Sequence, residues 1–202
     1  MPRPASAPFP ALLVLFLLAA CGGSEPAPDG EPAATADPET PATTATSPEA
    51  GVSRARELGV ANAAEPLPGL LTAAQPDEAQ LAALTDAGVG TAISFRPRDE
   101  SGAGWEEAFA ADRALDFHRI PVAGASDLSR EAVEELDRLL AEAGNGPTLL
   151  YCASSNRVGA LLALRAYWLQ GVPSQEALQL GREAGLRGLE PAVAELLGME
   201  DR

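Results

Sequence analysis

Hydrophobic positions follow two different spacings from about residue 52 onward. Short apolar runs of strand length alternate with longer segments in which apolar residues recur every three or four positions. The short runs predict strands and the longer segments predict helices with one buried face. Strands are expected at 67–72, 91–95, 117–122 and 147–151. Helices are expected at 76–87, 105–113, 129–143, 158–170, 174–184 and 191–197. This alternation with short connections predicts an α/β fold in which helices flank a mostly parallel central sheet.

Residues that begin and end helices support these bounds. Ser129 and Ser174 each precede a helical pattern and are expected to be N-caps, because their hydroxyls accept from unpaired N–H groups of the first turn. Gly88, and later Gly171 with Pro173, are expected to end the helix before them.

Polar connections follow the predicted strands. In parallel sheets, ligands bind at the carboxyl edge, where these connections meet. The connections at that edge are residues 96–100, 123–128 and 152–157. We therefore expect three distant segments to converge, and together they hold acids, several arginines and Cys152.

Cys152 lies between an apolar strand and a helical segment. A helix N-terminus offers unpaired N–H groups and a partial positive charge, which favour the ionised thiolate and bind anions. Arg157 follows in the same connection and has the geometry to grip a tetrahedral oxyanion with two parallel hydrogen bonds. The pattern predicts a nucleophilic thiol in an anion-binding loop.

The N-terminus has the pattern of an export signal over residues 1–20. One basic residue, Arg3, precedes an apolar stretch that is shorter than the roughly 20 residues needed to span a bilayer. The run 18–21 resembles the lipobox of bacterial lipoproteins, which implies cleavage before Cys21 and lipidation of its sulfur. The alternative is an ordinary secretory signal. Once Cys21 is lipidated, Cys152 is the remaining thiol and an internal disulfide is excluded.

Residues 21–52 are expected to form a disordered tether behind the lipidated cysteine. The segment is rich in Pro, Ala, Thr and Glu, and it offers too little apolar surface to offset the entropy of ordering. A partner-binding role is the alternative. The folded domain is expected to occupy residues 53–202.

The charge balance limits the classes of partner that the protein is expected to bind. Net charge is −15, and every basic side chain is an arginine. No basic stripe is present for nucleic acid, and docking on an anionic lipid surface is disfavoured. Membrane contact is therefore expected only through the lipid at Cys21, in the cell envelope on the periplasmic side. Because Gly22 rather than Asp follows Cys21, the resemblance to sorting rules of enteric bacteria favours the outer membrane.

Motifs in the folded part resemble one enzyme family. They are Leu71–Pro76, Ile93–Pro97, Ile120–Val122 and Tyr151–Ala160. Together they resemble the bacterial branch of dual-specificity-type cysteine phosphatases, the beta-lactamase hydrolase-like phosphatase family. The resemblance implies a cysteine-phosphatase-like fold, a phosphocysteine intermediate, no metal or other cofactor, and a phosphorylated substrate whose class stays open.

The resemblance also implies roles for particular residues. Cys152 is the nucleophile, and Arg157 binds the phosphoryl group and stabilises charge in the transition state. The phosphoryl oxygens are held by the backbone N–H groups of Ala153, Ser154, Ser155, Asn156 and Arg157. Asp127 is the candidate general acid.

Several of these assignments have alternatives. Asp127 is equally well interpreted as a residue that starts the following helix, and Asp99 is the second candidate acid. Arg96 and Arg98 either attract a dianionic substrate or are solvated loop charges. His118 is the single histidine and is better explained as a packed or rim-exposed strand residue than as a catalytic base. One His and one free Cys are too few ligands for a structural zinc site.

The loop departs from the family pattern. Ser155 stands where the family usually has glycine, at a position that approaches the anion closely and favours positive φ. Its hydroxyl either strains the loop or donates to the thiolate. Four residues separate Cys152 from Arg157, fewer than in the eukaryotic phosphatases. Val158 replaces a hydroxyl residue, and Tyr151 replaces the usual histidine.

These departures leave two other functions open. Rhodanese-like sulfurtransferases also carry a cysteine on a short strand-to-helix loop, hold sulfur as a persulfide, and need no acid. A non-catalytic anion-binding module would require only the loop. A phosphatase is the preferred hypothesis.

Overall fold

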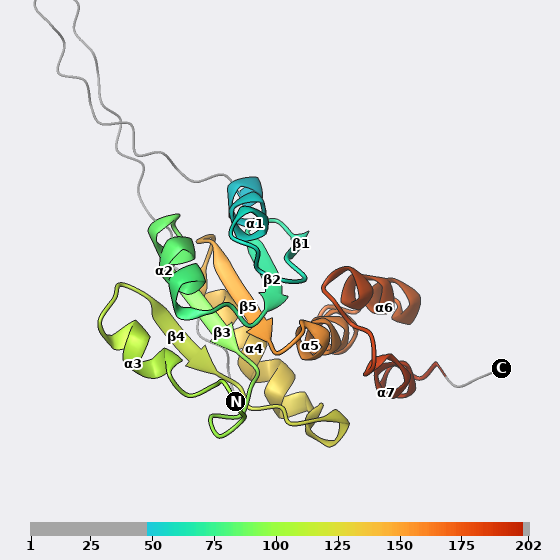
Figure 1. Cartoon of the computed structure of the whole chain (residues 1–202). Coiled ribbons are helices and arrows are strands. Elements are labelled where there is room, and N and C mark those ends of the chain that lie inside the picture. Colours follow the sequence, from blue (N-terminus) through green and yellow to red (C-terminus); the bar gives the residue numbers. More distant parts are fainter. Residues whose placement is uncertain (1–47, 200–202) are drawn as a thin grey trace, which may run out of the picture. The chain divides into compact units, whose positions relative to one another are not determined.

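The computed structural model describes residues 48–199, with side chains from residue 51. The predicted signal peptide, Cys21 and most of the predicted tether lie outside this range. The central sheet contains β1 (Ala64–Leu67), β2 (Leu70–Ala74), β3 (Thr91–Ser94), β4 (Asp116–Arg119) and β5 (Thr148–Cys152). The strand order is β1-β2-β5-β3-β4 (Figure 1). Only β1 runs antiparallel to its neighbour, so the predicted mostly parallel sheet is confirmed.

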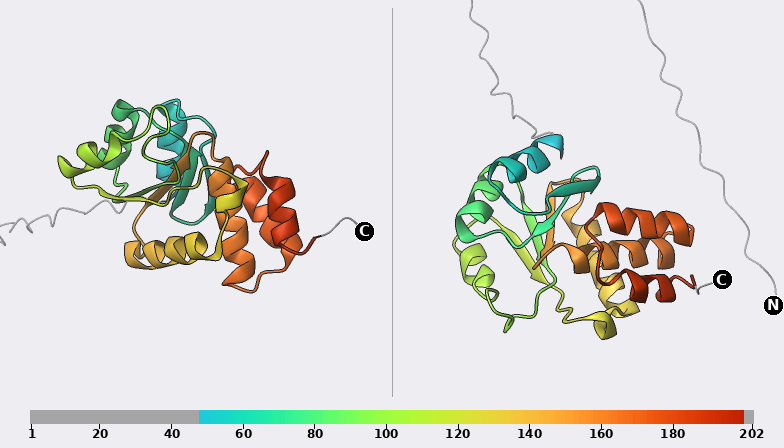
Figure 2. Two further views of the ribbon diagram at one scale, coloured as in Figure 1. Left: turned by 90° about the horizontal axis from the view of Figure 1, so that it is seen from below. Right: turned by 45° about the vertical axis from the view of Figure 1, so that its right-hand side comes forward.

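Helices cover both faces of this sheet. They are α1 (Pro48–Glu57), α2 (Glu78–Asp86), α3 (Glu106–Ala111), α4 (Arg130–Ala143), α5 (Asn156–Trp168), α6 (Ser174–Glu183) and α7 (Glu190–Leu196). Side chains of α1, α2 and α3 share one buried cluster, and those of α4 to α7 share the other. Figures 1 and 2 show α6 and α7 packed beyond α5, on its side away from the sheet.

The central strand β5 is buried at every position. Leu149 and Tyr151 point into the cluster with α1 to α3, whereas Leu150 and Cys152 point into the cluster with α4 to α7. This alternation follows from the two-residue period of a strand, and burial on both faces is typical of a parallel strand. Cys152 therefore ends the most protected strand of the sheet.

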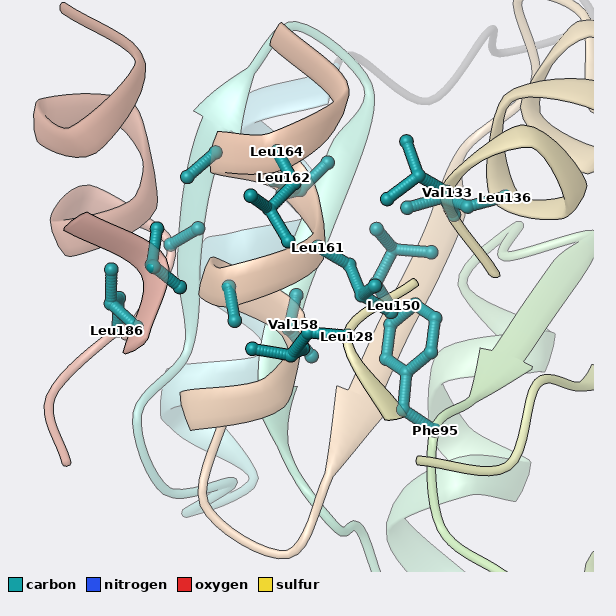
Figure 3. Packing of buried hydrophobic residues seen from close by; sticks show 14 of the residues in the cluster. Phe95, Leu128, Val133, Leu136, Leu150, Val158, Leu161, Leu162, Leu164 and Leu186 are labelled. Atoms are coloured by element: carbon teal, nitrogen blue, oxygen red, sulfur yellow. The ribbon is translucent and has the colours of Figure 1, made fainter. Parts of the chain in front are cut away.

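Apolar packing anchors the connections around the end of β5. Phe95 after β3, Leu128 before α4 and Val158 in the first turn of α5 are all at most 5% exposed. Figure 3 shows Leu128 and Val158 close together beside Phe95 and Leu150. The core thus holds the three connections at the carboxyl edge in fixed positions.

Several helix boundaries match the sequence patterns. Ser129 caps α4 and accepts a hydrogen bond from the N–H of Ala132 at 3.2 Å. Asp77 caps α2 in a reciprocal capping box with Gln80. The prediction for Ser174 was wrong, because Pro173 is the N-cap and Ser174 is the first residue of α6.

The largest differences between the predicted and the observed elements lie at the start of the domain. A single strand at 67–72 was expected, but Pro68 and Gly69 form a turn between β1 and β2. Gly69 has φ +76°, which a Pro-Gly turn requires, so this dipeptide should have ended the predicted strand. Helix α1 was also missed, although Ala55 within it is fully buried.

The strand predicted at 117–122 ends earlier, at Arg119. Beyond it, the N–H of Ile120 still donates to Ser94 O, and the N–H of Val122 donates to Phe95 O. The chain therefore stays attached to the β3 connection while it leaves the regular strand.

Candidate active site

The loop from Cys152 to Arg157 joins the end of β5 to the start of α5. Ser155 is the N-cap of α5 and has φ +66°, in the left-handed region that the sequence analysis anticipated at this position. The backbone N–H groups from Ala153 to Val158 have no acceptor among residues 48–199. Because buried backbone donors are nearly always paired, such a run of free donors is typical of an anion-binding loop.

The side chain of Ser155 is directed away from the thiol. Its hydroxyl donates to the carbonyl oxygen of Ala184 at 2.7 Å, and the residue is fully buried. A Cβ on Gly185 would lie 2.6 Å from the Ser155 Cβ, so only glycine fits opposite this serine. The hydroxyl therefore fastens the loop to the end of α6, and its donation to the thiolate is not observed.

Two asparagines hold the loop from outside. Asn62 donates to the carbonyl oxygen of Ser154 at 3.1 Å. The side-chain oxygen of Asn156 accepts from the N–H groups of Arg187 and Leu189 at 2.8 and 3.3 Å. In a planar trans peptide the C=O and N–H point in opposite directions. The N–H of residue 155 is therefore turned away from Asn62.

Cys152 carries a free thiol that is fully buried. The residue belongs to the apolar cluster formed with α4 to α7. Its place at the end of β5 is the one predicted from the sequence, but complete burial was not anticipated. A reactant must displace neighbouring atoms to reach this sulfur.

Arg157 brings the connections at the carboxyl edge together. Its Nη1 donates to Glu100 Oε2 at 2.7 Å and to the carbonyl oxygen of Val122 at 2.8 Å, and it lies 3.5 Å from Phe95 O. Its Nη2 donates to Glu100 Oε1 at 2.9 Å. The guanidinium thus joins the predicted connections 96–100 and 152–157, and it reaches the third at Val122, the residue before 123–128.

The charges at this point stabilise each other. The hydrogen bond from Arg157 is the main cause that lowers the pKa of Glu100 to about 2, against the opposing effect of burial, and Arg96 adds to it. The pKa of Arg157 is raised, chiefly by Glu100 and further by Cys152. Glu100 is therefore ionised at any physiological pH.

Arg96 lies behind Glu100 and is 7% exposed. Its Nε donates to Glu100 Oε1 at 2.8 Å, and its Nη1 donates to Gln75 Oε1 at 2.8 Å. The side chain is thus occupied by protein acceptors, unlike Arg98, which is exposed.

A second polar cluster continues from Gln75. Glu106 is fully buried and accepts from Gln75 Nε2 at 3.0 Å, from the Tyr151 hydroxyl at 3.3 Å and from Arg119 at 3.0 Å. Burial and the charge of Glu106 raise the pKa of Tyr151. Tyr151, in the place of the family's histidine, is therefore a neutral donor in this cluster.

The two candidate acids differ in burial. Asp127 is half-buried, and its Oδ2 accepts from the N–H of Ala123 at 2.7 Å within its own loop. Asp99 is exposed. The structure brings neither carboxylate into a hydrogen bond with Cys152 or Arg157, so the general-acid role of Asp127 stays a prediction.

His118 lies on β4 at the edge of the sheet. Its Nε2 is 3.0 Å from Asp116 Oδ2, and the side chain is partly exposed. Within residues 48–199, no cluster of His, Cys, Asp and Glu side chains has the arrangement of a metal site. None of the helices in that range is sufficiently long and apolar to traverse a bilayer.

Sequence reasoning missed the carboxylate that pairs with Arg157, since it identified Glu100 only as part of a polar run. It also missed Glu106 and Arg119 of the second polar cluster. Their signal is weak because Glu100 and Arg157 lie 57 positions apart in the chain. The position of Arg96 directly after the apolar run 91–95 was the nearest signal in the sequence.

A comparison with protein families finds no family that matches this sequence, and no curated protein matches it. Solved structures do match. A candidate phosphatase (DUF442) from Shewanella putrefaciens CN-32 is similar with a TM-score of 0.58 and 19% identity, over 73% of this chain and 96% of that one. A candidate phosphatase from Neisseria meningitidis Z2491 gives 0.53 and 22% identity, over 66% and 97%.

TpbA from P. aeruginosa is similar as well, with a TM-score of 0.50 and 21% identity over 71% of this chain and 86% of that one. At such identities the likeness concerns the fold. The chain has a cysteine-phosphatase-like α/β fold, as the sequence analysis predicted.

Proposed function

We propose that the domain is a phosphoric monoester hydrolase that works through a phosphocysteine on Cys152. The observation that carries the proposal is the loop from Cys152 to Arg157, whose N–H groups from 153 to 158 have no acceptor in the described part of the chain and whose Arg157 is fixed at the carboxyl edge of the sheet. The likeness of the fold to solved phosphatases supports it.

In the first half-reaction, the thiolate of Cys152 attacks phosphorus. The S–P bond forms as the P–O bond to the leaving group breaks, and the leaving oxygen takes a proton from Asp127. The loop N–H groups and Arg157 bind the phosphoryl oxygens and stabilise the charge that they carry in the transition state.

In the second half-reaction, water attacks the phosphocysteine. The S–P bond breaks and the thiolate leaves, while the carboxylate of Asp127 accepts the proton from water. Inorganic phosphate is released, and the enzyme returns to its starting protonation state.

The test of this function is hydrolysis of an aryl phosphate by the full chain. We expect turnover by the wild type, a phosphoryl adduct on the peptide that contains Cys152, and loss of turnover in Cys152→Ser. Turnover that survives in Cys152→Ser would refute the mechanism.

The acid role of Asp127 has its own test. Its carboxylate is half-buried, and its hydrogen bonds within residues 48–199 come only from Ala123 and Ser126 of its own loop. We expect Asp127→Asn to lower kcat by roughly 10²- to 10⁴-fold for poor leaving groups, and far less for good ones. Asp99→Asn is the parallel variant, and a larger effect there would move the assignment to Asp99.

A non-catalytic anion-binding module is the second candidate, and the complete burial of Cys152 favours it. In that case the full chain binds phosphate but turns over no phosphate ester, and Cys152→Ser leaves the binding unchanged. Conversion of cyanide by the full chain with thiosulfate, without phosphate release, would instead identify the sulfurtransferase.

We further propose that a lipid on Cys21 anchors the domain in the cell envelope, on the periplasmic side and in the outer membrane. The sequence pattern of residues 18–21 supports the anchor, and Gly22 supports the outer membrane. Residues 21–47 would then act as the tether, because the end of the predicted segment 21–52 belongs to α1. Cys21→Ser should move the full-length protein from the membrane fraction to the soluble fraction, and an unchanged distribution would exclude the anchor.

A further inference from the structure

The protein uses the N–H donors of Arg157 unevenly. A guanidinium has five N–H donors in a fixed planar fork. Both donors on Nη1 are taken, one by Glu100 and one by Val122 O, and one donor on Nη2 is taken by Glu100. Nε and the second N–H of Nη2 have no acceptor in the part of the chain that the structure describes.

The two remaining donors form a matched pair. The N–H of Nε and one N–H of Nη2 lie parallel on the same edge of the guanidinium, which is the arrangement that binds two oxygens of a carboxylate or phosphate at once. Glu100 occupies the adjacent edge. It therefore leaves the bidentate edge available instead of filling it.

Glu100 is itself held in place. Its Oε1 accepts from Arg96 Nε as well as from Arg157 Nη2, at 2.8 and 2.9 Å. Arg96 is buried and its Nη1 is fixed by Gln75. The carboxylate thus lies between two guanidiniums, and its ionisation at neutral pH matches the depressed pKa.

We propose that Glu100 is a positioning residue, fixed by Arg96, which holds Arg157 with its Nε–Nη2 edge directed at the phosphoryl group. The inference rests on the proposed phosphatase function. In the opposite arrangement, Glu100 would be an internal anion that competes with the substrate for Arg157. The two arrangements predict changes of opposite sign when the carboxylate is removed.

The test is Glu100→Gln in the full chain, with Glu107→Gln as the matched control. Glu107 has the same chemistry in the neighbouring polar cluster, but it contacts Arg119 and not Arg157. We expect Glu100→Gln to lower kcat for an aryl phosphate by about 10- to 100-fold with a smaller change in KM. The affinity for vanadate should fall by a similar factor, and Glu107→Gln should match the wild type in both.

Tighter binding of phosphate or vanadate by Glu100→Gln would show competition and overturn the proposal, as would unchanged binding and kcat. Arg96→Lys is the second variant, because it keeps the charge but loses the fork that fixes Glu100. It should shift kcat in the same direction by a smaller factor. In an Arg157→Lys background, Glu100→Gln should cause no further loss of vanadate affinity, because its effect passes through Arg157.

Failure of the proposed function is distinguishable from failure of this inference. If the wild type turns over no phosphate ester, calorimetric titration with inorganic phosphate still reports on Arg157. Weaker phosphate binding by Glu100→Gln would then support positioning without catalysis. If the wild type is active and Glu100→Gln equals it in kcat, KM and phosphate affinity, the positioning role is refuted and the phosphatase stands.

Discussion

Two arginines at the carboxyl edge of the sheet are equally buried but differently used. The side chains of Arg157 and Arg119 are 11% and 12% exposed. Arg119 directs Nε to Glu107 at 2.8 Å and Nη2 to Glu106 at 3.0 Å, so carboxylates of the protein occupy its Nε–Nη2 edge. On Arg157 the same edge has no acceptor among residues 48–199.

The difference separates a structural arginine from a functional one. A buried cation whose bidentate edge is filled by carboxylates of the protein is costly to unpair and has no such edge left for a ligand. Arg157 is fixed by Glu100 and by Val122 O, its Nε–Nη2 edge has no acceptor among residues 48–199, and it ends a loop of free N–H groups. Burial and charge alone would not distinguish the two side chains, whereas the use of individual donors does.

Exchange of each arginine for lysine should produce the largest contrast. Lysine keeps the charge but cannot form the bidentate fork. We expect Arg157→Lys to lower kcat/KM for an aryl phosphate by about 10²- to 10³-fold with a small change in stability. Arg119→Lys should instead lower the free energy of unfolding by about 2 kcal/mol and keep kcat/KM of the folded protein near wild type. Steady-state kinetics measure kcat/KM, and urea unfolding measures stability. A loss of stability in Arg157→Lys together with a loss of kcat/KM in Arg119→Lys would contradict the comparison.

Substitution of the two carboxylates around Arg119 should lower the free energy of unfolding by different amounts, because their burial differs. Glu106 is fully buried, whereas the Glu107 side chain is 36% exposed. Glu106→Gln should lower the free energy of unfolding by about 3 kcal/mol because it leaves buried donors without a charged partner. Glu107→Gln should cost less than about 1 kcal/mol. Equal losses of unfolding free energy in the two variants, measured with urea, would show that Glu106 is no more important than Glu107 as a partner of Arg119.

The pH dependence of stability should reveal the ion pair of Arg157. The pKa of Glu100 is about 2 in the folded protein against an ordinary value of 4.5. A depressed pKa contributes stability that is complete above 4.5 and is lost as the pH falls toward 2. The difference in unfolding free energy between wild type and Glu100→Gln should therefore shrink from pH 4.5 to pH 2. A constant difference over that range would mean that Glu100 is not paired as described.

The smallest effect is expected at Ser155, in the loop that precedes Arg157. Glycine would relieve the left-handed conformation, worth about 1–2 kcal/mol. It would also lose the hydrogen bond to Ala184 O, worth about 1 kcal/mol, and add backbone entropy to the unfolded chain. Ser155→Gly should thus change the free energy of unfolding by less than about 1 kcal/mol, with kcat/KM close to wild type. A large loss of activity in an otherwise stable variant would assign the hydroxyl a role that its position does not explain.

The sequence was sufficient to predict the loop from Cys152 to Arg157 and its location at the carboxyl edge of the sheet. Alternating strand and helix patterns predicted that connections after different strands meet at one edge, and that edge is where Arg157 contacts Glu100 and Val122. The positive φ of Ser155 was also anticipated, because a glycine usually stands there. These features depend on local pattern and on the topology of parallel sheets.

Other features depend on pairs of residues that are distant in the chain. The pairing of Glu100 with Arg157 and of Tyr151 with Glu106 leaves no periodic signal in the sequence. Burial of Cys152 results from packing of whole helices against β5, which the strand pattern does not specify. The missed turn at Pro68 is different, since its dipeptide signal was present and was overridden by the surrounding leucines.

The most direct measurement is alkylation of Cys152 by iodoacetate in the folded full-length chain, followed by peptide mass mapping, with and without phosphate or vanadate. If the loop is an anion-binding nucleophilic site, Cys152 reacts without unfolding despite its burial, and both anions slow the reaction. Reaction only under unfolding conditions, at a rate that neither anion changes, would contradict the enzymatic role of Cys152.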